Sequence, residues 1–398
     1  MRASSAAALS LIAAILGGAV VLVLGKGAGW LGGDTTTIVH SRLTDAGVPN
    51  AVVAARPLAG NGFQPAQIYR ARAAGVVTIV SDFDANGASA GQGSGFVVSR
   101  KGVVLTAAHV ITTAGQGAVG NATAAHAVWV QFADGDRVPA RIVGFDLYDD
   151  VGVLRVDPAQ HALHPVPLGR SASVVVGAPV AAIGSPFGNA DSLSVGVVSA
   201  TGRSIPSLTT HYDLVDAIQT DAPINHGNSG GPLFDARGRV IGINAQIRSS
   251  GTSSGFEGVG FAVPIDSARR SLEQLLATGH VAYGYVGIST EDITPSVGRR
   301  FHLGVTQGAL VSVVRSGSPA ARAGLRAGTR DVAFEGLDVR VGGDAIVAID
   351  GAPVRSAADV VRLVSGRLLP GQVARFTVVR DGRRLTLPVT LATRTGSG

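Results

Sequence analysis

The sequence predicts a mostly β protein with more than one domain. Short runs of Val, Ile and Leu recur along the chain between Gly-rich turns, a pattern typical of barrels and sandwiches rather than βαβ units. The 55 glycines and the low aromatic share of 5% also fit many short strands and turns. At about 150 residues per domain, a chain of 398 residues suggests two or three domains.

The composition excludes several classes of site. The chain has no cysteine, which rules out disulfides, thiolate metal sites and a cysteine nucleophile. The net charge is +6, but the arginines are scattered and no long basic run or RNA-type aromatic motif is present, so nucleic acid is not an expected partner. Attraction to anionic membrane surfaces is a milder alternative. His161 and His164 are expected to lie in a surface turn, and neither a metal site nor a cofactor is expected.

Residues 1–26 are expected to be a membrane anchor or a signal sequence. Residues 6–25 are apolar and uncharged, and about 20 such residues can span a bilayer. A cleaved signal peptide would have a shorter apolar core and a small-residue cleavage site. An uncleaved single-pass anchor in the cytoplasmic membrane is therefore favoured, with the rest of the chain on the extracytoplasmic side. Residues 27–72, which show little periodicity, are predicted to be a linker.

Residues 73–280 are predicted to form the first folded domain. Most of its regular structure is expected as strands, at 75–80, 93–98, 103–110, 127–132, 137–144, 151–156, 180–183, 194–200 and 239–243. The first clear amphipathic helix is predicted over 265–278, with Asp266 or Ser267 as its N-cap and Gly279 ending it.

The turn at residues 227–232, Gly-Asn-Ser-Gly-Gly-Pro, is the strongest candidate in the chain for a catalytic segment. Glycines on both sides of Ser229 allow positive φ angles and leave backbone N–H groups exposed beside the hydroxyl. An activated serine needs such donors for the oxyanion that forms after its attack. Gly-Ser strings are also ordinary turns, so this segment alone leaves both interpretations open.

An activated serine also needs a base and an acid that orients the base. His109 directly follows a predicted strand, where small alanines would let its imidazole lie against a neighbouring loop. Asp150 comes immediately before a buried strand and is the acid best placed to point inward, whereas Asp146 and Asp149 are expected to face solvent. A structural histidine and an acidic turn are the alternatives at this point.

Several motifs together resemble the HtrA/Deg family of serine proteases. They occur in the family's order over residues 70–395: Gly93-Ser-Gly-Phe, Thr106-Ala-Ala-His, Asp150-Val-Gly-Val-Leu, Ala182-Ile-Gly-Ser-Pro-Phe-Gly, Gln219-Thr-Asp-Ala-Pro-Ile-Asn, Gly227-Asn-Ser-Gly-Gly-Pro-Leu and Gly258-Val-Gly-Phe-Ala-Val-Pro-Ile. The resemblance implies a chymotrypsin-like double β-barrel followed by a PDZ domain.

The same resemblance implies a function and a set of roles. His109 would be the base, Asp150 the orienting acid and Ser229 the nucleophile, with the N–H groups of Gly227 and Ser229 forming the oxyanion hole. The expected activity is cleavage of misfolded or regulatory proteins outside the cytoplasmic membrane, without a cofactor or metal. Family members commonly form trimers, so a homo-oligomer is expected.

Four residues are expected near the substrate: Pro223, Asn225, Ile241 and Ile243. Pro223 stands six residues before Ser229, where a trypsin-like pocket would have an aspartate. Without that carboxylate, small aliphatic side chains are expected to be preferred over Lys and Arg.

Three further features near the site stand out. Asn228 stands where zymogen-type relatives carry an aspartate, so activation by N-terminal trimming is not expected. His226 departs from the proline usual in the family, most simply as a tolerated loop substitution. Residues 249–255 are expected to be a flexible loop near the site.

Residues 281–395 resemble an HtrA-type PDZ domain, which captures peptide C-termini by β-addition. Tyr285, Val286, Gly287 and Ile288 match the loop that holds the peptide carboxylate. A capped helix is predicted near 357–365. Residues 329–342 interrupt the common PDZ pattern and are predicted to add a hairpin. The alternative function is a non-proteolytic, PDZ-based binding or chaperone protein, which the presence of all three triad residues argues against.

Overall fold

The computed structural model describes residues 62–394, except 85–88, 119–120, 185–191, 211, 226 and 248–257. The expected anchor at residues 1–26, His226 and the loop at 249–255 therefore lie outside the described residues. Within the described ranges, no helix combines the length and the apolar character needed to cross a membrane.

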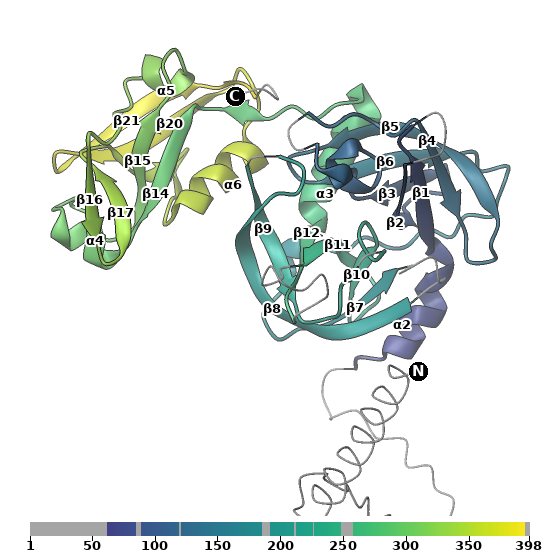
Figure 1. The fold of residues 1–398 in the computed structure, drawn as a ribbon. Helices are drawn as coiled ribbons and strands as arrows, with labels where there is room; N and C mark the ends of the chain where they lie inside the picture. Colours follow the sequence, from purple (N-terminus) through teal and green to yellow (C-terminus); the bar gives the residue numbers. More distant parts are fainter. Residues whose placement is uncertain are drawn as a thin grey trace, which may run out of the picture. The chain divides into compact units, whose positions relative to one another are not determined.

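The first folded unit is a closed six-stranded barrel (Figure 1, blue). Its antiparallel strands follow the order β1-β2-β3-β6-β5-β4. Their bounds are β1 Val76–Asp82, β2 Ala90–Val97, β3 Val103–Thr106, β4 Ala127–Gln131, β5 Arg137–Asp146 and β6 Val151–Val156. Two short 3₁₀ helices, Ala108–Val110 (η2) and Thr113–Gln116 (η3), follow β3, and η2 carries His109.

A second closed barrel follows (Figure 1, teal) in the order β10-β11-β12-β9-β8-β7. Its strands are β7 Pro179–Gly184, β8 Ser192–Pro206, β9 Asp213–Thr220, β10 Pro232–Asp235, β11 Val240–Ile247 and β12 Gly260–Pro264, and a 3₁₀ helix, η4 Ser171–Ser173, precedes them. Side chains of both barrels share one core, in which Phe96 and Leu105 of the first pack with Ile183 and Phe234 of the second. This shared core fixes the two barrels against each other and so aligns groups contributed by each.

The helix predicted over residues 265–278 is confirmed as α3, Ile265–Thr278. Gly279 ends it in the left-handed conformation, as expected for a helix-terminating glycine. The predicted cap was wrong, because Pro264 is the N-cap. Asp266 lies in the first turn instead, where its carboxylate accepts hydrogen bonds from the hydroxyl of Ser171 and the N–H of Ala172.

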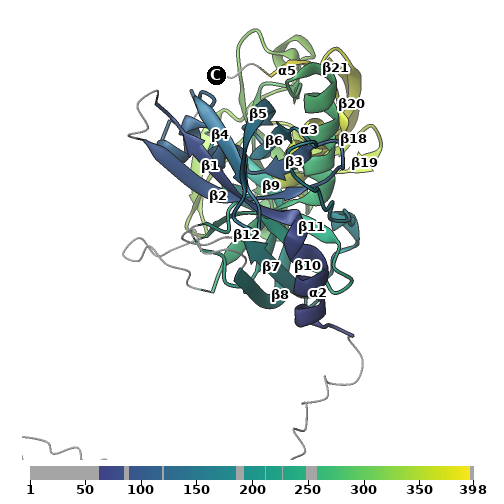
Figure 2. The same ribbon diagram turned by 90° about the vertical axis from the view of Figure 1, so that its right-hand side faces the viewer.

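The sequence did not indicate helix α2, Pro65–Arg72, which lies at the end of the segment predicted as a linker. A 3₁₀ turn, η1 Ala73–Gly75, connects α2 to β1. Figure 2 shows α2 beside the second barrel. Its Ile68 is buried in the shared core, and the Nε of Arg72 donates to the carbonyl of Gly238 at 2.9 Å. This packing makes the end of the linker segment part of the folded protein.

The C-terminal region forms an antiparallel sheet with helices packed beside it (Figure 1, green to yellow). The path of the sheet is β14-β15-β18-β20-β21, with β19 paired to β18. Its elements are β13 Gly284–Tyr285, β14 Ile288–Ile293, α4 Pro295–Arg300, β15 Gly308–Val314, α5 Pro319–Arg322, β16 Arg330–Phe334, β17 Leu337–Val341, β18 Ala345–Ile349, β19 Ala352–Pro353, α6 Ala357–Arg367, β20 Val373–Arg380, β21 Arg383–Thr390 and β22 Ala392–Thr393. Helix α6 begins with a capping box in which Ser356 and Asp359 exchange hydrogen bonds.

The segment at 329–342 contains an antiparallel hairpin, β16 paired with β17. Val339 and Val341 of β17 are buried in a small core that also includes Leu310 of the main sheet. A separate core holds Val360 and Phe376 with the inner side of α6. The hairpin thus gives the sheet a second packed layer.

Candidate active site

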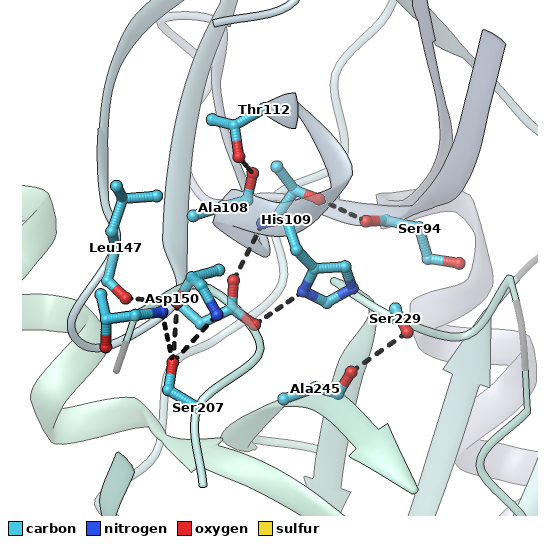
Figure 3. A network of polar contacts seen from close by, with 12 residues as sticks. Ser94, Ala108, His109, Thr112, Leu147, Asp150, Ser207, Ser229 and Ala245 are labelled. Atoms are coloured by element: carbon cyan, nitrogen blue, oxygen red, sulfur yellow. Dashed lines mark hydrogen bonds and ion pairs between the residues drawn. The ribbon is translucent and has the colours of Figure 1, made fainter. Parts of the chain in front are cut away.

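His109 and Asp150 meet in the first barrel through two contacts (Figure 3). Asp150 Oδ2 lies 2.7 Å from His109 Nδ1, and Asp150 Oδ1 accepts the backbone N–H of His109 at 2.9 Å. Because a carboxylate accepts hydrogen bonds, the contact places the proton on Nδ1 and leaves Nε2 as the acceptor. Asp150 holds a positive φ of 51°, which turns the chain sharply between β5 and β6.

Ser229 lies on the other side of the imidazole, in a turn contributed by the second barrel (Figure 3). Its hydroxyl donates to the carbonyl of Ala245 at 3.2 Å. The far edge of the His109 ring faces this serine in the close-up view. The structure therefore brings together all three residues that the sequence singled out, with the serine proton directed to Ala245.

Backbone hydrogen bonds hold the peptide groups of the turn around Ser229. The carbonyl of Asn228 accepts the N–H of Gly231 at 3.0 Å, and Gly230 donates to Asn244 at 2.7 Å. Gly227 and Gly230 have φ angles of 98° and 84°, which residues with a side chain rarely adopt. Among the described residues, no protein group accepts the N–H of Gly227 or of Ser229. Two N–H groups are thus available for an oxygen that approaches this turn.

The electrostatics around His109 favour its protonated form. Burial alone lowers the pKa of His109, but the charge of Asp150 and its hydrogen bond act against burial, and the net pKa is raised above 6.5. A proton accepted at Nε2 would therefore be held more firmly than by a free imidazole. This is the property that a general base needs when it becomes positively charged during a reaction.

The prediction that Asp146 and Asp149 face solvent was wrong. Both are buried, with 2% and 7% exposure. Asp146 Oδ2 accepts the hydroxyls of Ser271 and Tyr283, each at 2.6 Å, and Asp149 pairs with Arg270 at 2.6 Å. Burial and the neighbouring charge of Asp149 raise the pKa of Asp146 to about 6, against the lowering effect of its hydrogen bonds. Sequence reasoning missed this network, which anchors the loop that carries Asp150.

The four residues expected near the substrate lie in two different environments. Ile241 and Ile243 are 3% and 0% exposed and pack inside the cores, because β11 is paired on both sides and covered on both faces. Pro223 and Asn225 lie beside the serine turn, where the carbonyl of Asn225 accepts the N–H of Asn228 at 3.0 Å. Only these last two are placed where a substrate could reach them.

The predicted carboxylate loop lies beside a groove in the C-terminal domain. A cavity of about 360 Å³ is lined by residues 284–290, by the side of α6 at 357–365 and by other segments. Tyr285, Val286, Gly287 and Ile288 all belong to its lining. Gly287 has a φ of 81°, and a Cβ there would lie 2.3 Å from the Cβ of Ser318. The groove follows β14, which is an edge strand of the sheet.

The described part of the chain contains no candidate metal-binding site. No group of three or more His, Asp or Glu side chains gathers there in a way that could hold an ion.

Comparisons with known proteins agree with this geometry. A trypsin-like peptidase domain matches residues 93–243, and a PDZ domain matches residues 284–391. The chain is 39% identical over 301 residues to a probable periplasmic serine endoprotease, DegP-like, of Ectopseudomonas mendocina (strain ymp), covering 76% of this chain and 56% of that protein. A DegP-like protein of Pseudomonas fulva (strain 12-X) is 38% identical over the same length and coverage. The chain spans about half the length of these curated relatives.

Solved structures are similar over nearly their whole length. The HtrA-type protease AlgW with a tripeptide superposes with a TM-score of 0.68 at 32% identity, covering 83% of this chain and 98% of that one. A serine endoprotease from Yersinia pestis gives a TM-score of 0.59 at 28% identity, covering 83% and 98%. With both domains in the same order and these similarities across them, the chain belongs to the HtrA/Deg family of serine proteases.

Proposed function

We propose that this protein is a serine endopeptidase that cleaves misfolded or regulatory proteins. The observation that carries the proposal is the His109 imidazole, held by two contacts to Asp150 on one side and facing Ser229 on the other (Figure 3). In this assignment Ser229 is the nucleophile, His109 the general base and Asp150 the group that orients and stabilises the imidazole.

The reaction begins when the Ser229 hydroxyl turns from Ala245 toward His109 Nε2. The oxygen then bonds to the scissile carbonyl carbon while Nε2 takes the proton. The resulting oxyanion would accept the N–H groups of Gly227 and Ser229, which have no acceptor among the described residues. Collapse of the intermediate breaks the C–N bond, and the leaving amine takes the proton from Nε2. Water, deprotonated by the same nitrogen, hydrolyses the acyl-enzyme.

Cleavage of unfolded casein by the purified protein tests this assignment, with Ser229→Ala as the matched variant. Activity that disappears in Ser229→Ala is the expected result. Equal activity in both proteins would refute the assignment of the nucleophile. If neither protein cleaves casein while both suppress its aggregation, the non-proteolytic binding alternative would be the better description.

We also propose that side chains at the cleavage position are small and aliphatic. Support comes from Pro223, which supplies no carboxylate beside the serine turn to pair with Lys or Arg. Mapping the cleaved bonds in casein by mass spectrometry tests the preference. Predominant cleavage after Lys or Arg would contradict it.

The groove along β14 is proposed to bind peptide C-termini by β-addition. An edge strand offers unpaired backbone groups, and the positive φ of Gly287 shapes the loop at the end of the groove. Binding of fluorescent peptides with a free or an amidated C-terminus tests this in Ser229→Ala, which cannot consume them. Weaker binding of the amidated peptide is expected, and equal binding of both would contradict a carboxylate site.

Membrane anchoring and self-association complete the proposal. The apolar run at 6–25 supports a single-pass anchor, with the catalytic domains on the extracytoplasmic side, the side named for the periplasmic relatives. Resistance of the full chain to alkaline extraction from membranes would support the anchor, and release would contradict it.

A homo-oligomer, with the trimer of the family as the first expectation, is supported by an exposed apolar stripe on the second barrel. The stripe comprises Leu193, Val195 and Val197 on β8 with Val175 and Val176 nearby, and their exposure ranges from 36% to 65%. Light scattering of the purified protein and of Val195→Asp tests it. A monomeric mass for the unsubstituted protein would contradict the oligomer.

A further inference from the structure

Ser94 joins the first barrel to the turn that carries the nucleophile. It lies on β2, yet its polar groups reach the turn of the second barrel. Its hydroxyl donates to the carbonyl of Gly227 at 2.5 Å, and its N–H donates to the carbonyl of Ser229 at 2.7 Å. Its own carbonyl accepts the hydroxyl of Thr106 at 2.7 Å. The residue is completely buried, so these bonds do not compete with solvent.

These bonds act on the two peptide groups that flank the 228–229 peptide. The peptide between Gly227 and Asn228 is held at both ends, by Ser94 at its carbonyl and by Asn225 at its N–H. The peptide between Ser229 and Gly230 is held in the same way, by the N–H of Ser94 and by Asn244. The N–H of Ser229 belongs to the peptide between these two, whose carbonyl, that of Asn228, accepts the N–H of Gly231. Because each peptide group is planar, holding the peptides on both sides limits how far this middle peptide and its N–H can rotate. The N–H of Gly227 directly precedes the first held peptide, so its direction depends on the same anchor.

The space around the Ser94 side chain is shaped by glycines. A Cβ added to Gly184 would lie 3.0 Å from the Ser94 hydroxyl oxygen, and one added to Gly231 would lie 3.0 Å from the Ser94 Cβ. A Cβ on Gly230 would lie 2.2 Å from the Ser94 carbonyl oxygen. The close approach of the two segments therefore depends on the absence of side chains at these positions.

We propose that Ser94 is a positioning residue for the oxyanion hole, and that its hydroxyl, by holding the carbonyl of Gly227, keeps the neighbouring N–H donors of Gly227 and Ser229 in the orientation that the reaction needs. This inference rests on the proposed protease function. Because the hydroxyl donates to the carbonyl of Gly227, its expected effect on the reaction passes through the serine turn. A donor that is displaced by even a fraction of its hydrogen-bond length loses much of its effect on the transition state.

The test compares Ser94→Ala with Ser81→Ala. Ser81 is also completely buried in the first barrel, on β1, but its hydroxyl has no hydrogen-bond partner among the residues that the structure describes. Two reactions are measured, cleavage of a fluorogenic peptide taken from a mapped casein site and labelling of Ser229 by a fluorophosphonate, whose phosphoryl oxygen also enters the oxyanion hole.

Ser94→Ala is expected to lower kcat and the labelling rate about 10- to 100-fold, somewhat less than the loss of an oxyanion donor itself. KM should change less than about twofold, and the apparent pKa of the pH–rate profile should stay unchanged, because His109 and Asp150 keep their contacts. Ser81→Ala should match the unsubstituted protein in both reactions. A general loss of folding would instead lower the active fraction and leave the labelling rate of the active molecules unchanged.

Two results would overturn the inference. The first is a kcat and a labelling rate in Ser94→Ala that equal those of the unsubstituted protein. The second is a changed apparent pKa of the pH–rate profile in Ser94→Ala, together with a loss of kcat in Ser81→Ala as large as that in Ser94→Ala. Failure of the unsubstituted protein to cleave the peptide or to react with the fluorophosphonate would count against the protease function itself, and so is distinguishable from both.

Discussion

The carboxylate of Asp150 holds both the ring and the backbone of His109, with Oδ2 at 2.7 Å from Nδ1 and Oδ1 at 2.9 Å from the backbone nitrogen. One side chain thereby sets the tautomer of the imidazole and its position relative to the barrel. Because the His109 side chain is only 13% exposed, the same carboxylate also offsets the loss of solvation when the imidazole becomes charged.

We expect Asp150→Asn to lower kcat about 10⁴-fold, since an amide can hold the imidazole in the wrong tautomer. The substitution also removes the charge that raises the pKa of His109. The enzyme needs neutral His109, so its activity should fall as the pH drops through that pKa, and in the variant this fall should occur at a lower pH. A pH profile of kcat/KM checks both effects. An unchanged acid limb would contradict the electrostatic role of Asp150.

The buried Asp146 is expected to make the protein more stable in mild acid. Its pKa is about 6 in the folded protein and near 3.8 when exposed, so unfolding releases a proton between these values. The stabilising contribution is complete below about pH 4 and is lost as the pH rises through about 6. The shift corresponds to at most about 3 kcal/mol.

Asp146→Asn removes this titration and should flatten the dependence of the unfolding free energy on pH between about 4 and 6. Urea unfolding at several pH values measures the slope. The exposed Asp157, substituted as Asp157→Asn, is the matched control and should leave the slope as it is. A slope in Asp146→Asn equal to that of the unsubstituted protein would show that Asp146 does not titrate in this range.

The residues of the proposed triad and the extent of one helix could be inferred from the sequence because their signals are local. The 3.6-residue periodicity and Gly279 indicated the extent of α3, although not its N-cap, and the small residues around His109 and Ser229 are contiguous in the chain. The burial of Asp146 could not be predicted in this way. Its partners Ser271 and Tyr283 lie 125 and 137 positions further along the chain, and nothing local to Asp146 indicates them.

Helix α2 and the length of strand β8 were also mispredicted, because both depend on contacts with residues far away in the sequence. Helix α2 has only eight residues and a weak apolar face, and its Ile68 becomes buried only through contact with the barrels. Strand β8 extends from Ser192 to Pro206, well beyond the predicted 194–200, because its polar second half is held by an irregular ladder to β9. Nothing local to Ser94 indicates its role, because the carbonyl of Gly227 that its hydroxyl contacts lies 133 positions further along the chain.

A buried ion pair, Arg380 with Asp344, is expected to be important for the stability of the PDZ domain. Asp344 is completely buried, and Arg380 Nε and Nη2 donate to its two oxygens at 2.6 and 2.7 Å. Arg380→Met would leave the carboxylate buried without a counter-charge, which typically costs about 3–5 kcal/mol. Asp331→Asn, at an exposed pair 3.7 Å from Arg340, should cost less than about 1 kcal/mol. Thermal unfolding compares the two, and equal losses would contradict the difference in burial.

The neutral side chain of Asn228 leads to a last prediction. Asn228 is 3% exposed and its Nδ2 donates to the carbonyl of Pro223 at 3.4 Å. Its Oδ1 is buried and has no hydrogen-bond partner within the described ranges. Asn228→Asp would place a carboxylate there with no cation among its described contacts. A buried, unpaired carboxylate shifts its pKa upward and destabilises the state that contains its charged form.

We therefore expect Asn228→Asp to lose activity at neutral pH by distorting the turn, and to recover part of it as the pH falls and the new carboxylate takes up a proton. Asn228→Ala removes the same amide without adding a charge, and its activity relative to the unsubstituted protein should not rise in acid. Fluorophosphonate labelling of Ser229 between pH 5 and 8 measures this ratio directly. If Asn228→Asp were as active as the unsubstituted protein at pH 8, a cation or a donor must reach this pocket, and the turn would tolerate the charge that zymogen-type relatives use for activation.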